Sequence, residues 1–311
     1  MEEIYKLIDE RKYDEALKKL LVLPDNYLLK AQCLYELERY NELVSFFEQI
    51  NEMIENDYFE VLGYYILALI KLEDYDKALN MINDELAMPY VQEDYYEVLN
   101  NLYDDVLAQK QAFLVDNNAY DIRLDDETIE HILLDHDNYD EQLDVIMRLE
   151  DYNIRKLLPI IETFLVNDNS LVLKTFILEL LVKQQINEAV LVNKNGFEYE
   201  FLPNANLLVF QDLNYLKIRD LLEVHLAKQP SFLEMCYDIL DLVVYIIYPE
   251  IISEDETYLA ALIEYYVFSL NSEELMTDFT RYYQIDLSFV ESNLSELINI
   301  LESEEKYGSL I

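Results

Sequence analysis

The stretch "LIKLEDYDKALNMI", from Leu69 to Ile82, decides the fold, because close variants of it recur along the chain. The variants are "LIDERKYDEALKKL" at 7–20, "LYELERYNELVSFF" at 34–47 and "LLDHDNYDEQLDVI" at 133–146. Each copy has a leucine six residues before a tyrosine and apolar residues four and seven residues after it. Offsets of four and seven fall on one face of a helix, so we expect a helix to open just after each tyrosine. The repeated unit is therefore predicted to be an antiparallel pair of helices with a tyrosine at the turn.

The four turns share a short motif. Its tyrosines are Tyr13, Tyr40, Tyr75 and Tyr139. An acid or asparagine follows each tyrosine, and Ala16 and Ala78 supply a small residue at the third position in two copies. This motif resembles the tetratricopeptide repeat (TPR), a helical hairpin of about 34 residues that stacks into a solenoid.

The resemblance is strongest over residues 1–90 and weakens towards residue 150. Leu43 and Gln142 replace the small residue in the other two copies, and the tyrosines lie 27, 35 and 64 residues apart. Only the spacing of 35 fits the TPR period. The wider resemblance is to acidic TPR-containing proteins of low-GC Gram-positive bacteria.

Later parts of the chain also read as helical, with one exception. Asn195-Gly196 is a favoured two-residue hairpin turn, and alternating apolar residues flank it on both sides. We therefore expect an all-α fold with one small β-hairpin, divided into four segments. These are TPR-like helical hairpins at 1–118, degenerate TPR-like or HEAT-like helical repeats at 119–186, the β-hairpin at 187–203 and an α-helical lobe at 204–311.

Glycine is scarce, with three residues in a chain of 311. Backbone at positive φ is easiest for glycine, so we expect few strained turns and no glycine-rich loop that cradles phosphate. Helices joined by short turns are the alternative that this composition favours.

The chain is strongly acidic: it has 64 acidic and 22 basic residues, which gives a net charge of −42 at pH 7. Residues 92–147 hold sixteen acids and two basic residues, and residues 229–305 hold seventeen acids and one. Such a field repels nucleic acids and anionic membranes and attracts cationic surfaces. It also favours solubility, which is the simpler interpretation of the same composition.

Residue patterns for catalysis, metals or cofactors are missing from the sequence, so we expect neither an enzyme nor a cofactor. The two cysteines, Cys33 and Cys236, fall in apolar helical patterns, which is typical of buried thiols in a reducing compartment. No stretch reaches the length of about 20 apolar residues that a membrane span needs, and no export signal opens the chain. We expect a cytoplasmic protein without a membrane or direct nucleic-acid partner.

The resemblance to TPR proteins implies that the first helix of each hairpin lines a concave face where ligands bind. Carried over to this sequence, that face consists of Tyr5, Asp9, Asp25, Gln32, Tyr35, Glu36, Glu60 and Lys71, and the degenerate fourth copy adds Glu127, His131 and Asp135. Its carboxylates and tyrosines favour a basic protein or peptide as the partner, because clamp-type TPR domains that hold acidic termini use lysine and arginine instead. A non-catalytic interaction scaffold is the leading hypothesis. A peptide-sensing regulator and an acidic mimic or chaperone for a nucleic-acid-binding protein stay open as alternatives.

Overall fold

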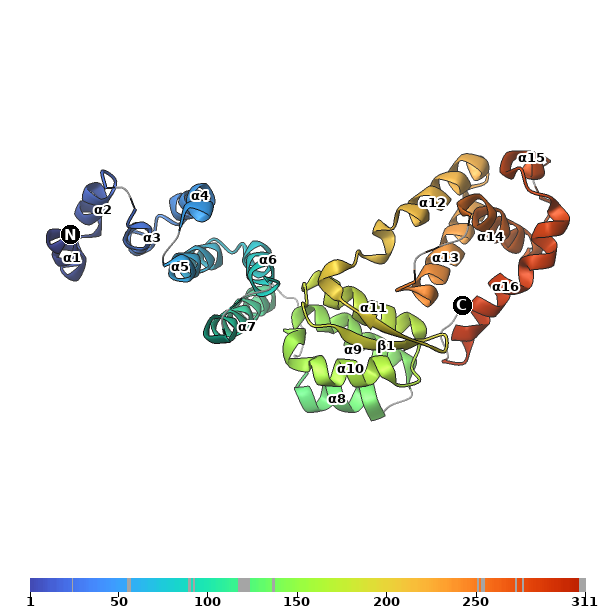
Figure 1. Cartoon of the computed structure of the whole chain (residues 1–311), viewed down its shortest axis with the longest axis horizontal. Helices are drawn as coiled ribbons and strands as arrows, with labels where there is room; N and C mark the ends of the chain where they lie inside the picture. The colour runs from blue at the N-terminus through green and yellow to red at the C-terminus, as the bar shows by residue number, and fades with distance from the viewer. Residues whose placement is uncertain are drawn as a thin grey trace. The chain divides into compact units, whose positions relative to one another are not determined.

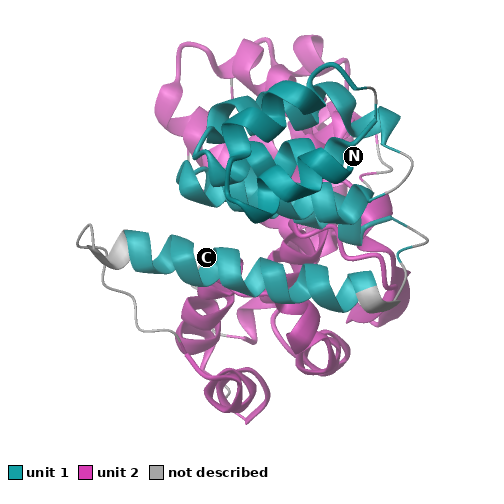
Figure 2. Ribbon diagram, turned by 90° about the vertical axis from the view of Figure 1, so that its left-hand side faces the viewer, with its two compact units in different colours: residues 1–122 teal, residues 123–311 magenta. Residues whose placement is uncertain are grey.

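The structure is a computed structural model of the whole chain. It describes residues 1–23, 25–54, 57–88, 91, 93–116, 124–135, 138–250, 252, 255–271, 273–275 and 277–307. Within these residues it holds sixteen α-helices and one two-stranded β-hairpin, which confirms the expected all-α class with a single small hairpin (Figure 1). The chain divides into two compact units, residues 1–122 and 123–311 (Figure 2).

Unit 1 is a succession of helices that pack in pairs. Its helices are α1 (Glu2–Asp9), α2 (Tyr13–Leu20), α3 (Tyr27–Glu36), α4 (Tyr40–Ile50), α5 (Tyr58–Lys71), α6 (Tyr75–Leu86) and α7 (Glu93–Asp116), with a 3-10 turn at Asn51–Met53 after α4. Each helix packs against the next, and α5 also packs against α3 and α7. Among the first helices, α3 therefore lies next to α5, and α5 next to α7.

The repeated tyrosines begin helices, as the sequence predicts. Tyr13, Tyr40 and Tyr75 are the first residues of α2, α4 and α6. Three residues after each tyrosine stands a fully buried side chain, alanine in two copies and Leu43 in the other. The apolar residue seven positions after the tyrosine is also buried in every copy. Each second helix therefore packs one apolar face against the core of the unit.

Left-handed backbone closes the turns between these helices. Arg11, Glu38 and Glu73, each two residues before a repeated tyrosine, have φ of 56°, 57° and 61°. After α3, the Glu38 N–H donates to the Tyr35 carbonyl at 2.9 Å and the Arg39 N–H to the Leu34 carbonyl at 2.9 Å. The turns after α1 and α5 repeat both bonds. This is the Schellman motif, whose left-handed position is usually glycine.

The expectation of few strained turns was therefore wrong. Nine residues other than glycine have positive φ in the described part of the chain, against one glycine, Gly196. Scarcity of glycine does not prevent such turns, because paired backbone hydrogen bonds hold charged and polar residues in the left-handed region at a cost of about 1–2 kcal/mol each.

Unit 2 contains nine further helices and the hairpin among its described residues. The helices are α8 (Asp126–Asp135), α9 (Tyr139–Arg148), α10 (Leu158–Val166), α11 (Leu171–Lys183), α12 (Leu213–Leu226), α13 (Pro230–Ile247), α14 (Glu256–Leu270), α15 (Phe279–Tyr283) and α16 (Leu287–Glu305). Short 3-10 turns lie at Leu149–Asp151, Ile154–Leu157, Pro203–Ala205 and Val209–Gln211. The segments predicted at 119–186, 187–203 and 204–311 thus share this unit.

Two apolar cores meet at α11. One core takes residues from Ile129 to Phe201, and the other takes residues from Leu171 to Leu301. Helix α11 supplies Ile177 to the first and Val172 to the second, which explains why its side chains are apolar nearly all round.

The β-hairpin consists of β1 (Val190–Lys194) and β2 (Phe197–Phe201) in antiparallel register. Asn195 and Gly196 both have positive φ, as the predicted two-residue turn requires. Lys194, 1% exposed, anchors the hairpin: its Nζ donates to the carbonyls of Tyr245 at 2.9 Å and Tyr248 at 2.6 Å, at the end of α13.

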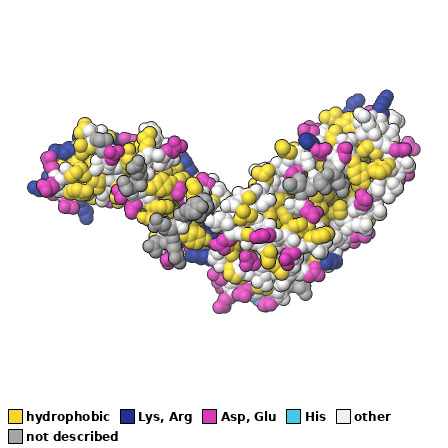
Figure 3. All heavy atoms as spheres, viewed as in Figure 1, with side chains coloured by type: hydrophobic (Ala, Val, Ile, Leu, Met, Phe, Trp, Pro, Cys, Tyr) yellow, Lys and Arg dark blue, Asp and Glu magenta, His cyan; other side chains and the backbone are white. Residues whose placement is uncertain are grey.

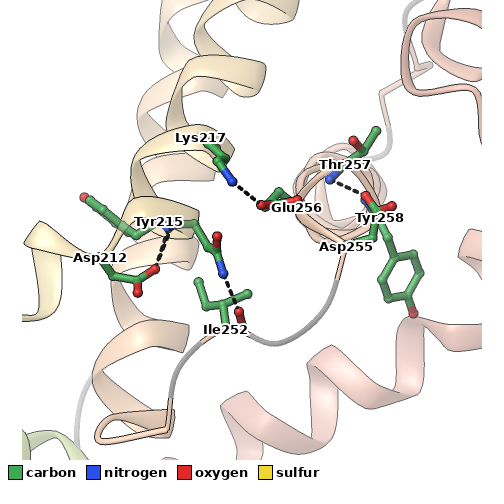
Figure 4. A network of polar contacts seen from close by, with 9 residues as sticks. Asp212, Tyr215, Lys217, Ile252, Asp255, Glu256, Thr257 and Tyr258 are labelled. Atoms are coloured by element: carbon green, nitrogen blue, oxygen red, sulfur yellow. Dashed lines mark hydrogen bonds and ion pairs between the residues drawn. The ribbon is translucent and has the colours of Figure 1, made fainter.

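Polar contacts join the starts of α12 and α14 (Figure 4). Asp212 caps α12 by accepting from the Tyr215 N–H at 3.0 Å, and Asp255 caps α14 by accepting from the Thr257 N–H at 2.8 Å. Between the helices, Lys217 lies 2.8 Å from Glu256. These contacts fix the two helices side by side within unit 2 (Figure 4).

Candidate functional site

The predicted binding residues fall in both units. Eight of them belong to unit 1, on or next to the first helices α1, α3 and α5: Tyr5, Asp9, Asp25, Gln32, Tyr35, Glu36, Glu60 and Lys71. The other three, Glu127, His131 and Asp135, lie on α8 in unit 2. The candidate site is therefore built here from unit 1 alone.

Four of these residues occupy the same place in their helices. Asp9, Glu36, Lys71 and Asp135 are the last residues of α1, α3, α5 and α8. A carboxylate at a helix C-terminus faces the negative end of the helix dipole, which is unfavourable by about 0.3–1 kcal/mol. Helix stability thus does not account for the acids in three of the four copies.

Glu36 is the acid that the structure surrounds with tyrosines. Tyr35 precedes it on α3, and its ring lies 5.6 Å from that of Tyr40 at the start of α4 and 5.7 Å from that of Tyr64 on α5. Tyr13, at the start of α2, lies near the Glu36 carboxylate, and burial and the charge of that carboxylate raise the pKa of its phenol. We call these five residues, Tyr13, Tyr35, Glu36, Tyr40 and Tyr64, the Glu36 cluster.

The Glu36 cluster is open to solvent at its acid. Glu36 is exposed and the four tyrosines are half-buried. Burial raises the pKa of Tyr13 and of Tyr64, and the Glu36 charge raises both further, so the phenols remain neutral and can donate hydrogen bonds at neutral pH. Beneath them, Cys33 is buried, and burial together with Glu36 raises its pKa to about 11. Its thiol therefore stays protonated and is a packing group.

The remaining predicted residues lie outside this cluster. Asp25, just before α3, lies 3.5 Å from the Tyr27 hydroxyl at the other end of that helix from Glu36. Glu60 and Lys71 stand near opposite ends of α5, about 16 Å apart along a helix. Tyr5 is 52% exposed on α1 and Gln32 is half-buried on α3. On α8, His131 Nδ1 lies 3.2 Å from Asp135, and both side chains are exposed.

Sequence reasoning included Tyr35 and Glu36 and missed the three tyrosines around them. The repeat motif indicates that Tyr13 and Tyr40 plug the helical turns, and no sequence pattern singles out Tyr64. The signal was available in the repeat itself. The repeated tyrosine follows the last residue of the preceding helix by four positions, and that residue is an acid in three of the four copies.

Unit 2 holds a second polar cluster, which lies inside its core. His225 Nδ1 and the Tyr283 hydroxyl each lie 2.7 Å from Glu264 Oε2, and burial raises the pKa of Glu264. The ring of Tyr282 stacks on His225 at 4.3 Å. This network joins α12, α14 and α15. Among the described residues, no group of three or more His, Cys, Asp or Glu side chains is arranged to hold a metal ion.

No protein-family model matches the chain, and no curated protein is significantly similar to it in sequence. None of the helices in the described ranges combines the length and the apolar character that spanning a membrane requires.

Proposed function

We propose that the protein is a non-catalytic, TPR-like interaction scaffold of the cytoplasm that binds a basic protein or peptide through the first-helix face of unit 1. One observation carries this proposal: the exposed Glu36 carboxylate stands among four tyrosines and has no ion-pair partner in the described part of the chain. Tyrosine supplies large contact area at low entropic cost, and a carboxylate supplies orientation.

The charge of the whole chain supports the same partner. With a net charge of −42 at pH 7, the protein attracts cationic partners. Salt screens this attraction beyond a Debye length of about 8 Å at physiological ionic strength. On the face seen in Figure 3, acidic side chains are spread among hydrophobic ones over both units. The net charge would thus bring a basic partner near, and the tyrosines would determine where it binds.

A charge-reversal experiment tests the proposal with a labelled octalysine peptide as the probe. Asp9→Lys with Glu36→Lys should weaken binding by about tenfold, because two carboxylates of the binding face become cations. Glu15→Lys with Glu52→Lys is the matched control: both residues are exposed in unit 1, away from the first-helix face, and the net charge changes equally. We expect this control to weaken binding by no more than about threefold, through the long-range field alone.

Titration with salt completes the test. Affinity for octalysine should fall steeply between 50 mM and 500 mM NaCl in the unmodified protein, since screening shortens electrostatic attraction. Equal losses in the two double variants, or an affinity that salt leaves unchanged, would refute binding at the first-helix face.

A further inference from the structure

The chain holds its own cations in a recurrent way, by a tyrosine together with a carboxylate. The fullest instance is in unit 2. The Arg219 guanidinium lies 3.9 Å from the centre of the Tyr237 ring, and its Nη1 donates to the Tyr215 hydroxyl at 2.7 Å. That hydroxyl donates in turn to Asp241 at 2.8 Å. Guanidinium, aromatic face, phenol and carboxylate thus form one connected group.

Lys306 repeats the combination, whereas Lys30 repeats the contact with a tyrosine ring and donates its Nζ hydrogen bond to the Leu23 carbonyl at 2.9 Å. Lys306 Nζ lies 4.4 Å from the centre of the Tyr307 ring and 3.0 Å from Asp168, which also accepts a hydrogen bond from the Tyr307 hydroxyl. In unit 1, Lys30 Nζ lies 5.5 Å from the centre of the Tyr27 ring, and the hydroxyl of that tyrosine lies 3.5 Å from Asp25. Attraction of a cation to the negative face of an aromatic ring explains these arrangements.

The Glu36 cluster has the same groups without the cation. Burial and the Glu36 charge raise the pKa of Tyr13 and of Tyr64, and the rings of Tyr35 and Tyr64 lie 5.7 Å apart. In the ranges that the structure describes, no lysine or arginine pairs with Glu36 or lies over these rings. The two nearest arginines do not fill the place: Arg39 pairs with Glu42, and Arg11 is exposed and acts on Tyr13 only through its charge.

We propose that the Glu36 cluster binds an arginine side chain of the partner. This inference rests on the proposed function and names the group that the site recognises. A guanidinium is planar and weakly hydrated, so it stacks on tyrosine rings and donates two parallel hydrogen bonds to a carboxylate. Glu36 is exposed, and a carboxylate has about four lone-pair sites, so it can accept both hydrogen bonds of a guanidinium. Lysine would gain the charge attraction without the paired hydrogen bonds.

The experiment compares two labelled peptides of equal charge, hexaarginine and hexalysine, by fluorescence anisotropy with the full chain. We expect the unmodified protein to bind hexaarginine about fivefold more tightly. Tyr35→Leu with Tyr64→Leu should reduce this ratio to about one and change hexalysine affinity by less than about twofold, because the charge is unaltered. Circular dichroism would establish that the variant is folded.

Three further variants separate the effect of the aromatic rings from that of the protein's overall negative charge. Tyr35→Phe with Tyr64→Phe retains both rings and should preserve the ratio, whereas Glu36→Gln should lower it. Tyr265→Leu removes a half-buried tyrosine of α14, outside both the first-helix face and the Glu36 cluster, and should preserve the ratio.

The outcomes distinguish this inference from the proposed function. Equal affinity for the two peptides, or an arginine preference that survives the loss of Tyr35 and Tyr64, would overturn the inference and leave a general basic partner in place. Failure of both peptides to bind would refute the proposed function, and the arginine site with it.

Discussion

Three residues in the helical turns adopt the left-handed backbone conformation, which side chains other than glycine disfavour. Arg11, Glu38 and Glu73 take positive φ because two backbone hydrogen bonds close each turn around them. Each places a repeated tyrosine two residues later at the start of a helix. The strain at these residues is thus linked to the position of the tyrosines that form the candidate site.

Replacing Glu38 by glycine should stabilise the protein. Glycine relieves about 1–2 kcal/mol of left-handed strain and costs about 0.5–1 kcal/mol in chain entropy, so we expect a net gain of about 0.5–1 kcal/mol in the free energy of unfolding. Urea unfolding of the full chain measures it. Glu38→Ala is the control, because alanine removes the charge and retains the strained Cβ. An equal gain from alanine would show that charge, and not backbone strain, is responsible.

The two thiols should be unreactive in the folded protein. Cys33 and Cys236 are fully buried, and burial raises the pKa of both, to about 11 for Cys33, so almost no thiolate is present at pH 8. A thiol-exchange reagent such as DTNB should release no colour from the native chain within minutes and react with two thiols per chain in 6 M guanidinium. Rapid reaction before unfolding would contradict the packing beneath Glu36.

At the scale of elements, the β-hairpin depends on one buried lysine. Lys194 is the last residue of β1. Its ammonium donates to the carbonyls of Tyr245 and Tyr248 and, at 2.6 Å, to the Thr175 hydroxyl. Burial lowers its pKa, while the three acceptors around Nζ favour the charged form. The hydrogen bonds therefore hold an isolated pair of strands, which alone is marginal in water, against α11 and α13.

Lys194→Met should lower the free energy of unfolding by about 2 kcal/mol, because the Tyr248 carbonyl would lose its side-chain donor and the Tyr245 carbonyl would keep only the Thr175 hydroxyl. Lys183→Met is the matched control: that lysine is exposed and paired with Glu150, and its loss should change stability by less than about 0.5 kcal/mol. Chemical unfolding of both variants provides the comparison. Similar stability of the two would contradict the anchoring role.

The elements themselves could be predicted from sequence, and their long-range contacts could not. Periodic apolar residues and the tyrosine motif located the helices of unit 1, and Asn195-Gly196 located the hairpin. Lys194 gave no such signal, because two of its acceptors lie about fifty residues later, the third lies on α11, and a lysine is rarely buried. The same limit applies to the Glu36 cluster: α2, α3, α4 and α5 each supply a residue, and only their packing places Tyr13 and Tyr64 beside Glu36.

At the scale of the whole molecule, acidity sets how stability depends on pH. Burial raises the pKa of Glu85 and of Glu264 above the unfolded value of 4.5. Below pH 4.5, both carboxyl groups are protonated in the folded and in the unfolded state. Above pH 4.5 they ionise more readily in the unfolded state than in the folded state, so the free energy of unfolding falls as pH rises. Repulsion among 64 acids acts in the same direction.

We therefore expect the urea midpoint to increase as pH falls from 7.5 to 5. Glu85→Gln preserves an acceptor for the Tyr58 hydroxyl and removes one titrating group, so its midpoint should depend less on pH than that of the unmodified chain. Glu97→Gln, at an exposed acid of α7, serves as the control and should leave the slope nearly unchanged. A midpoint that falls on acidification would contradict the burial of these acids.

The central claim is that a basic partner binds unit 1 at the Glu36 cluster, and photo-cross-linking tests it most directly. A hexaarginine peptide carrying one benzophenone residue would be irradiated with the full chain, and the adducts located by mass spectrometry. The account predicts adducts concentrated on α3 and α5, near Tyr35 and Tyr64, and lost with Glu36→Lys. Adducts confined to unit 2, or spread evenly over the acidic surface of both units, would contradict it.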